Sequence, residues 1–154
     1  MGEYEDWKAA ESFWYFDAVR KSALDTARLM DALTALESVL PGGLAAAESV
    51  RATKSTDALE RSVIKVLETM DRYRESLKEF SDLQASARKV VDSLDDPRHR
   101  AVLTMYYMNG RTWAEVAESI GYVEKYCMQL RDDAMVEAWE HLPKEWRTML
   151  PRAD

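Results

Sequence analysis

The sequence predicts an all-α protein in which a long helical arm is followed by a smaller C-terminal module. Only 5 Gly and 4 Pro occur among 154 residues, which leaves few places for turns. Hydrophobic residues make up 47% and charged residues 32%, a composition typical of folded helical proteins. Apolar residues also recur at helical spacing over most of the chain. We expect the arm in residues 1–94 and the module in residues 95–154.

Residues 3–40 predict one uninterrupted helix. The segment contains no Gly or Pro, and Pro41-Gly42-Gly43 follows it as a strong termination signal. Four consecutive aromatic residues, from Phe13 to Phe16, point in all directions around this helix. Part of that cluster must therefore contact something other than a single partner helix. Residues 41–55 predict the loop that leads to the next helix.

Residues 56–94 predict a coiled-coil helix. Its apolar residues step by alternating fours and threes, an average spacing of about 3.5. Such a helix needs a long partner, either residues 3–40 in an antiparallel hairpin or a second copy of the chain, and the spacing does not choose between them. Because one partner helix leaves apolar surface uncovered, we expect a homodimer, with Gln84 fixing the register. We call this series the seam: Leu59, Val63, Val66, Met70, Tyr73, Leu77, Phe80, Gln84, Ala87, Val91 and Leu94.

Helix signals then follow one another closely. Asp96 is an expected N-cap, with Pro97 at the first helical position, where its missing N–H costs nothing. Asn109-Gly110 ends the short helix that follows. Thr112 and Glu115 have the spacing of a capping box, in which each side chain accepts from the other residue's backbone N–H. A further helix must therefore begin at residue 113.

The apolar positions from Trp113 onward predict a helix-turn-helix. Val116 and Ile120 bury the first helix, and Ala117 is small where two helices would cross closely. Gly121 can adopt the left-handed conformation of the turn. The second helix is expected to be seated by Tyr122, Cys127 and Leu130 and to continue to Pro143, which is followed by a short C-terminal turn.

This module resembles region 4 of sigma factors. More closely, it is similar to a phage and prophage family of sigma-region-4-like helix-turn-helix proteins related to phage late-gene transcription regulators. The resemblance extends to the order of an N-terminal helix, a Gly-rich stretch, a long charged helix and this module. It implies a phage-encoded, sequence-specific transcription regulator whose second helix enters the major groove of double-stranded DNA. The motifs that carry it are Asp96-Pro97-Arg98, Thr112-Trp113-Ala114-Glu115-Val116-Ala117 and Ile120-Gly121-Tyr122.

The second helix departs from the family pattern of Ser or Thr followed by several basic residues. Between Val123 and Asp133 only Lys125 and Arg131 are basic. Base readout is expected from Gln129 toward adenine, Lys125 toward guanine and Glu124 toward cytosine. The remaining outward candidates on this helix are Tyr126 and Met128. The expected phosphate contacts are Arg98, Arg100, Arg111, Lys125 and Arg131, with Thr112 and the backbone N–H groups at the start of its helix.

A second class of function stays open because the formal net charge is −7, which opposes general affinity for nucleic acid. In that alternative the module binds protein, as a phage-encoded inhibitor or adaptor that acts on a host polymerase or defence complex. The single cysteine indicates a reducing compartment, so we expect the bacterial cytoplasm. No motif indicates an enzyme, a metal site or a cofactor, and no apolar run approaches the roughly 18 residues of a membrane span.

Overall fold

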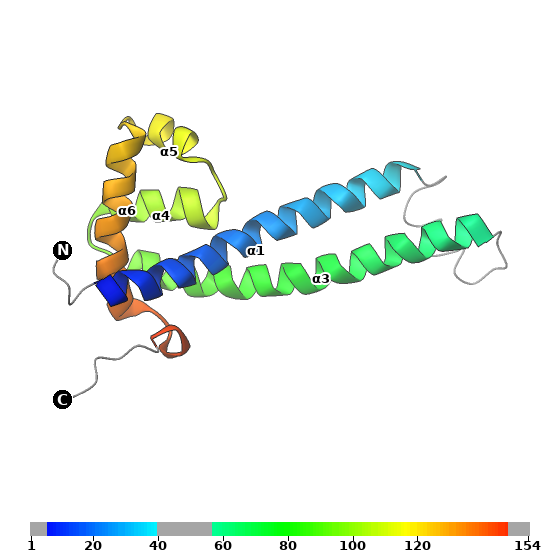
Figure 1. Cartoon of the computed structure of the whole chain (residues 1–154), viewed down its shortest axis with the longest axis horizontal. Helices are drawn as coiled ribbons and strands as arrows, with labels where there is room; N and C mark the ends of the chain where they lie inside the picture. The colour runs from blue at the N-terminus through cyan, green and yellow to red at the C-terminus, as the bar shows by residue number, and fades with distance from the viewer. Residues whose placement is uncertain (1–5, 40–56, 148–154) are drawn as a thin grey trace. The chain divides into compact units, whose positions relative to one another are not determined.

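The computed structural model describes residues 6–39 and 57–147, and these are helical with no strand, so the all-α prediction is confirmed (Figure 1). The predicted loop 41–55 lies outside the described residues. No helix in the described ranges is both long and apolar enough to cross a membrane. The helices are α1 (Asp6–Val39), α3 (Asp57–Asp92), α4 (Pro97–Leu103), α5 (Trp113–Ile120) and α6 (Glu124–Ala138), with the π-helical segment η2 (Thr104–Met108) and two 3-10 turns, η3 (Trp139–His141) and η4 (Lys144–Trp146).

Packing divides the described residues into two units. Unit 2 is residues 24–80, and unit 1 is the described part of Met1–Ala23 and Ser81–Asp154. The two long helices α1 and α3 each contribute to both units. The boundary expected between residues 94 and 95 is therefore not where packing separates the chain, because the start of α1 and the end of α3 belong to the same unit as the C-terminal helices.

Unit 2 consists of the parts of α1 and α3 within residues 24–80, which lie side by side in opposite directions (Figure 1). The hydroxyl of Thr26 lies 2.7 Å from that of Ser76 and also donates to the Ser76 carbonyl at 3.3 Å. Seam residues Val63 and Val66 are buried, and Leu59, Met70, Tyr73 and Phe80 are partly buried. This part of the seam is thus covered largely within one chain. Leu77 is the exception, with 40% of its surface exposed.

Unit 1 is built around an aromatic and aliphatic core. The first turns of α1 supply Tyr15 and Phe16, both fully buried, and Tyr15 bonds Ser86 of α3 through their hydroxyls at 2.6 Å. Three members of the aromatic cluster from Phe13 to Phe16 thus pack inside the chain, while Trp14 stays 53% exposed. The other buried members of this core come from α1, α3 and the bend after it, α4, η2, α6 and the turn after α6: Ala9, Val19, Ala87, Val90, Val91, Leu94, Leu103, Tyr107, Met108, Ala134, Met135, Ala138, Trp139 and Leu142.

The C-terminal end of the seam differs from the coiled-coil prediction. Val91 and Leu94 lie in the unit 1 core, packed with residues of the same chain. Leu94 also follows the end of α3, which stops at Asp92. Gln84 does not set a coiled-coil register, because its side-chain amide donates to the carbonyl of Met108 at 2.7 Å. Val91 and Leu94 are buried as predicted and Gln84 is partly buried, but all three pack within unit 1 of the same chain.

Candidate nucleic-acid interface

The site predicted from the sequence lies on α5, α6 and the turn between them. Val116 of α5 and Cys127 and Leu130 of α6 pack with Val102 of α4 in a second small core. Gly121 has φ 78°, in the left-handed region, and its N–H donates to the Ala117 carbonyl at 2.9 Å. This conformation favours glycine and reverses the chain between the two helices.

Tyr122 is a correction to the sequence prediction. It was expected to seat the second helix, but 41% of its surface is exposed. Its ring makes an edge contact with Tyr126, with 4.8 Å between the ring centroids. Tyr126, one turn further along, is the half-buried aromatic that packs on the second core. The aromatic that seats α6 is therefore displaced by four residues from the predicted position.

The start of α5 is closed by its predicted capping box. The N–H of Glu115 donates to the Thr112 hydroxyl at 3.2 Å, and the Thr112 N–H donates to the Glu115 carboxylate at 3.2 Å. These bonds to Thr112 hold the pKa of Glu115 below its ordinary value, so the group stays ionised. A phosphate approaching this end of α5 would meet the Glu115 carboxylate. Thr112 and the start of α5 are therefore weaker phosphate contacts than the sequence suggested.

Arg98 is exposed but held in place. Its guanidinium bonds Asp96 at 2.9 Å, and it donates to the Tyr126 hydroxyl at 2.9 Å. The side-chain and backbone hydrogen bonds from Arg98 lower the pKa of Asp96 to about 2. With 46% of its side chain exposed, Arg98 can still face a phosphate. Its guanidinium is held by Asp96, the N-cap of α4, and by Tyr126 in the first turn of α6.

Two of the five predicted phosphate contacts are committed inside the protein. Arg100 donates to the carbonyls of Leu94 at 2.5 Å and Asp95 at 3.0 Å, where it stabilises the bend after α3. Arg131 bonds the Asp132 carboxylate at 3.0 Å. Its guanidinium also lies 5.2 Å from the ring centroids of both Phe13 and Trp113. Only 22% of the Arg131 side chain is exposed, so this cation packs between aromatics.

The outer face of α6 carries the residues that remain available. Glu124, Lys125 and Gln129 are exposed, while Met128 is half-buried. Val123, the N-cap residue, is 71% exposed, and no described side chain caps the helix there. The face thus presents Lys125, Gln129, the aliphatic Val123 and two exposed acids, Glu124 and Asp133, a mixed surface suited to base edges more than to phosphates.

Two residues of the long helices position this site in roles that the sequence did not indicate. Arg20 of α1 donates to the carbonyls of Tyr106 at 2.5 Å and Arg111 at 2.8 Å, and it lies 3.8 Å above the Tyr106 ring. Gln84 of α3 caps the Met108 carbonyl. The carbonyls at the end of a helix have no partner within it, so both side chains complete the end of η2. They fix the segment that leads into α5.

Arg111 lies on this segment. Its side chain is exposed, with a long bond of 3.4 Å to the Ser119 hydroxyl. Its backbone is held at both groups, since its N–H donates to the Met105 carbonyl at 3.1 Å while its carbonyl accepts from Arg20. Arg111 is therefore an exposed cation on a hydrogen-bonded backbone, directly before α5.

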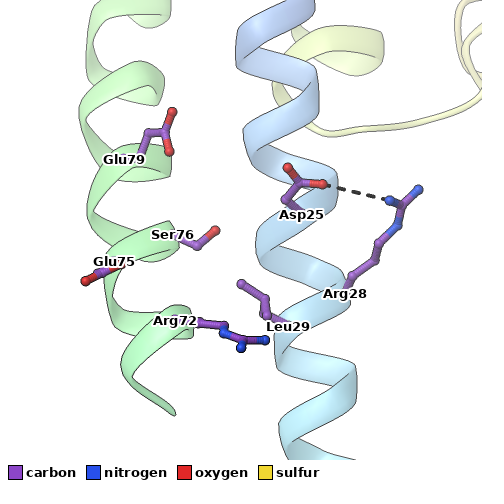
Figure 2. A pocket seen from close by; sticks show the side chains of 7 residues that line it. All are labelled: Asp25, Arg28, Leu29, Arg72, Glu75, Ser76 and Glu79. Atoms are coloured by element: carbon purple, nitrogen blue, oxygen red, sulfur yellow. Dashed lines mark ion pairs between the residues drawn. The ribbon is translucent and has the colours of Figure 1, made fainter. Parts of the chain in front are cut away.

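A separate hollow in unit 2 does not resemble a ligand site. It has a volume of about 510 Å³ and lies between α1 and α3 (Figure 2). Three acidic and two basic side chains surround it, with an ion pair of 3.8 Å between Asp25 and Arg28. Leu29 is the only apolar side chain in its lining among the described residues. The full lining is Asp25, Arg28, Leu29, Arg72, Glu75, Ser76 and Glu79.

Comparison with known proteins adds no relative: no family model, curated protein or solved structure matches this chain. A function has to be argued from the geometry and chemistry described above.

Proposed function

We propose that this chain is a phage-type, sequence-specific transcription regulator that binds double-stranded DNA in the bacterial cytoplasm. The observation that carries the proposal is the pairing of α5 and α6 through the left-handed Gly121, with the outer face of α6 exposed. In a helix-turn-helix the second helix lies in the major groove and its first residues contact base edges. The order of the helices and the small core between them fit that use.

The available side chains divide between base readout and phosphate contact. Gln129 can pair with adenine, Lys125 with guanine, and Glu124 can accept from cytosine. Arg98 and Arg111 are exposed cations that precede the turned helices, and they supply the phosphate contacts. With Arg100 and Arg131 committed internally, one module holds few phosphates. Affinity then depends on two modules binding together.

We propose that a homodimer supplies the second module through unit 2. Leu77 of α3 and Met30 of α1 are 40% and 48% exposed, so unit 2 carries large apolar side chains that a second copy could cover. A second copy that covers them would extend the hairpin into a bundle. Light scattering at micromolar concentration should then give twice the chain mass, and a mass of one chain at all concentrations would refute the dimer.

A second candidate function is supported by the same surface. The internal use of Arg100 and Arg131 leaves the α6 face weakly basic, and Tyr122 and Val123 are exposed apolar groups. Such a face suits a protein partner, as in a phage-encoded inhibitor or adaptor that acts on a host polymerase or defence complex. The two functions differ in whether a specific duplex is bound.

The test is binding of the full chain to duplex fragments of its source genome across a salt series. DNA binding predicts at least one fragment preferred over random duplex, with affinity that falls as salt rises. Gln129→Ala should weaken binding to the preferred fragment by about 1–3 kcal/mol and leave binding to random duplex unchanged. Arg111→Ala should weaken binding to the preferred fragment and to random duplex, and it should reduce the salt dependence of both affinities.

Lys78→Ala provides the matched control, because Lys78 is an exposed cation on α3 in unit 2. It should change neither the affinity for the preferred fragment nor the salt dependence. If no fragment is preferred at any salt concentration, the regulator proposal fails and the protein-binding function replaces it.

A further inference from the structure

Val123 occupies a position where an aliphatic side chain is a poor choice for folding. It is the N-cap of α6, with φ −71° and ψ 154°, and no described side chain closes this end of the helix. Helix N-caps favour Ser, Thr, Asp and Asn, whose oxygens accept from the first free N–H groups. Valine has no such oxygen, and 71% of its surface is exposed to solvent.

The other two helix starts in this region follow the rule. Asp96 caps α4 by accepting from the Arg98 N–H at 2.8 Å, and Thr112 caps α5 through the complete capping box. The chain therefore uses good caps next to α6 and omits one at α6 itself. Val123 is also more exposed than any other large apolar side chain in the described ranges. A residue that neither caps nor packs is best explained by an external contact.

We infer that Val123 is a specificity-determining residue that contacts the 5-methyl group of a thymine. This inference rests on the proposed DNA-binding function and names part of the sequence that α6 reads. The start of the second helix is the part of a helix-turn-helix that reaches base edges in the major groove. The thymine methyl is the one apolar group that base pairs present there, and aliphatic side chains recognise it by contact.

The other available side chains of α6 are consistent with a site that contains A·T pairs. Gln129 lies six residues after Val123, about 9 Å further along α6, and its amide can donate to and accept from an adenine of another base pair. Lys125 is the only basic side chain of α6 without a hydrogen bond or ion pair within the described residues, because Arg131 bonds Asp132. Few contacts to guanine are therefore available. We expect the bound sequence to contain a thymine opposite the start of α6.

Uracil tests this contact, because it differs from thymine only by the methyl group. The preferred duplex is first selected by the full chain from a random-sequence library, and each thymine is then replaced singly by deoxyuridine. Burying one methyl group stabilises by about 0.8 kcal/mol, which corresponds to about a fourfold change in affinity. One position in each half-site should show that loss, and the other thymines should not.

Two variants of Val123 test whether the loss of affinity on replacing thymine by deoxyuridine depends on this side chain. Val123→Thr and Val123→Ser both add a hydroxyl that can cap α6, so both should raise the thermal unfolding midpoint. Thr keeps one methyl group and Ser keeps none. Val123→Thr should retain discrimination between thymine and uracil at the sensitive position, and Val123→Ser should bind the two duplexes equally. Ile64→Ser is the control, because Ile64 is a 46% exposed aliphatic residue of α3 in unit 2 and should leave discrimination unchanged.

The outcomes separate the two proposals. A preferred duplex whose affinity is unchanged by uracil at every position overturns the Val123 inference and leaves DNA binding intact. Equal discrimination by Val123→Ser and the natural chain also overturns it. Failure to select any duplex overturns both and assigns the exposed valine to a protein contact.

Discussion

Replacing Arg20 with Met should destabilise unit 1 by about 2–3 kcal/mol. Arg20 donates to two carbonyls, and each hydrogen bond from a charged donor contributes about 1.5–3 kcal/mol. The stacking of its guanidinium 3.8 Å above the Tyr106 ring adds about 0.5–2 kcal/mol. Water can replace Arg20 at the exposed Arg111 carbonyl but less easily at the partly buried Tyr106 carbonyl, so the full sum is not lost. Met retains the apolar stem, which isolates the polar loss.

Urea unfolding followed by circular dichroism measures this change, and amide hydrogen exchange locates it. The Arg111 N–H, which donates to the Met105 carbonyl, should exchange faster in Arg20→Met. Arg28→Met is the matched control. Arg28 lies in unit 2 with 78% of its side chain exposed, and its contact with Asp25 is a long 3.8 Å ion pair. Such a surface pair contributes about 0–1 kcal/mol.

If Arg20→Met and Arg28→Met lowered the free energy of unfolding by the same small amount, this reasoning would be refuted. That result would show that the carbonyls at the end of η2 find water or another donor without cost. A large loss of stability with unchanged exchange at Arg111 would also contradict it, because the effect would then arise elsewhere in α1.

Three further predictions follow from the helix ends and from the shared core. Arg98 lowers the pKa of Asp96 to about 2, below the ordinary 3.8. The natural chain should therefore be more stable than Asp96→Asn above about pH 5, and this difference should disappear as pH falls from about 4 to 2. Thermal unfolding across this pH range measures the difference. Gly121→Ala should lower the free energy of unfolding in urea by about 1–2 kcal/mol, and Gly121→Asn should lower it less. No described atom lies within 4 Å of an added Cβ, so the loss comes from φ 78° alone. Residues 95–154 expressed alone should melt without a cooperative transition in calorimetry, and a sharp transition would contradict the shared core.

The helix ends could be predicted from the sequence because their signals are local. Asp96 before Pro97, and Thr112 three residues before Glu115, form hydrogen bonds within one turn of the chain. Gly121 follows from the left-handed turn that the apolar spacing around it requires. Each of these depends on neighbours that the sequence itself specifies. Their bonds and dihedral angles match the prediction.

The roles of the arginines could not be predicted, because each depends on a carbonyl or ring distant in sequence. Arg20 and Gln84 cap η2 across separations of 86 and 24 residues. Arg131 lies between rings from α1 and α5. An exposed phosphate-binding arginine and one that stabilises carbonyls have the same sequence signal. The expected phosphate set therefore lost Arg100 and Arg131, while the exposed outer face of α6 was predicted correctly at Glu124, Lys125 and Gln129.

The seam shows a second limit, and it leads to a test of assembly. A regular apolar spacing predicts that a helix face is buried, but not which element covers it. Up to Phe80 the seam lies in unit 2 with α1 beside it, and from Gln84 onward it lies in unit 1. Only the first part can therefore meet a second copy, and there Leu77 is the exposed member.

Leu77→Glu should consequently convert a homodimer to a single chain in light scattering while the helical circular dichroism signal stays unchanged. A charge placed in an apolar interface cannot be desolvated without a large cost, whereas at an exposed position of one chain it is tolerated. Lys78→Glu, at the adjacent exposed position, makes a larger change in charge and should leave the dimer intact. A dimer that survives Leu77→Glu would show that copies associate through another surface, and the seam would then be a feature of the single chain alone.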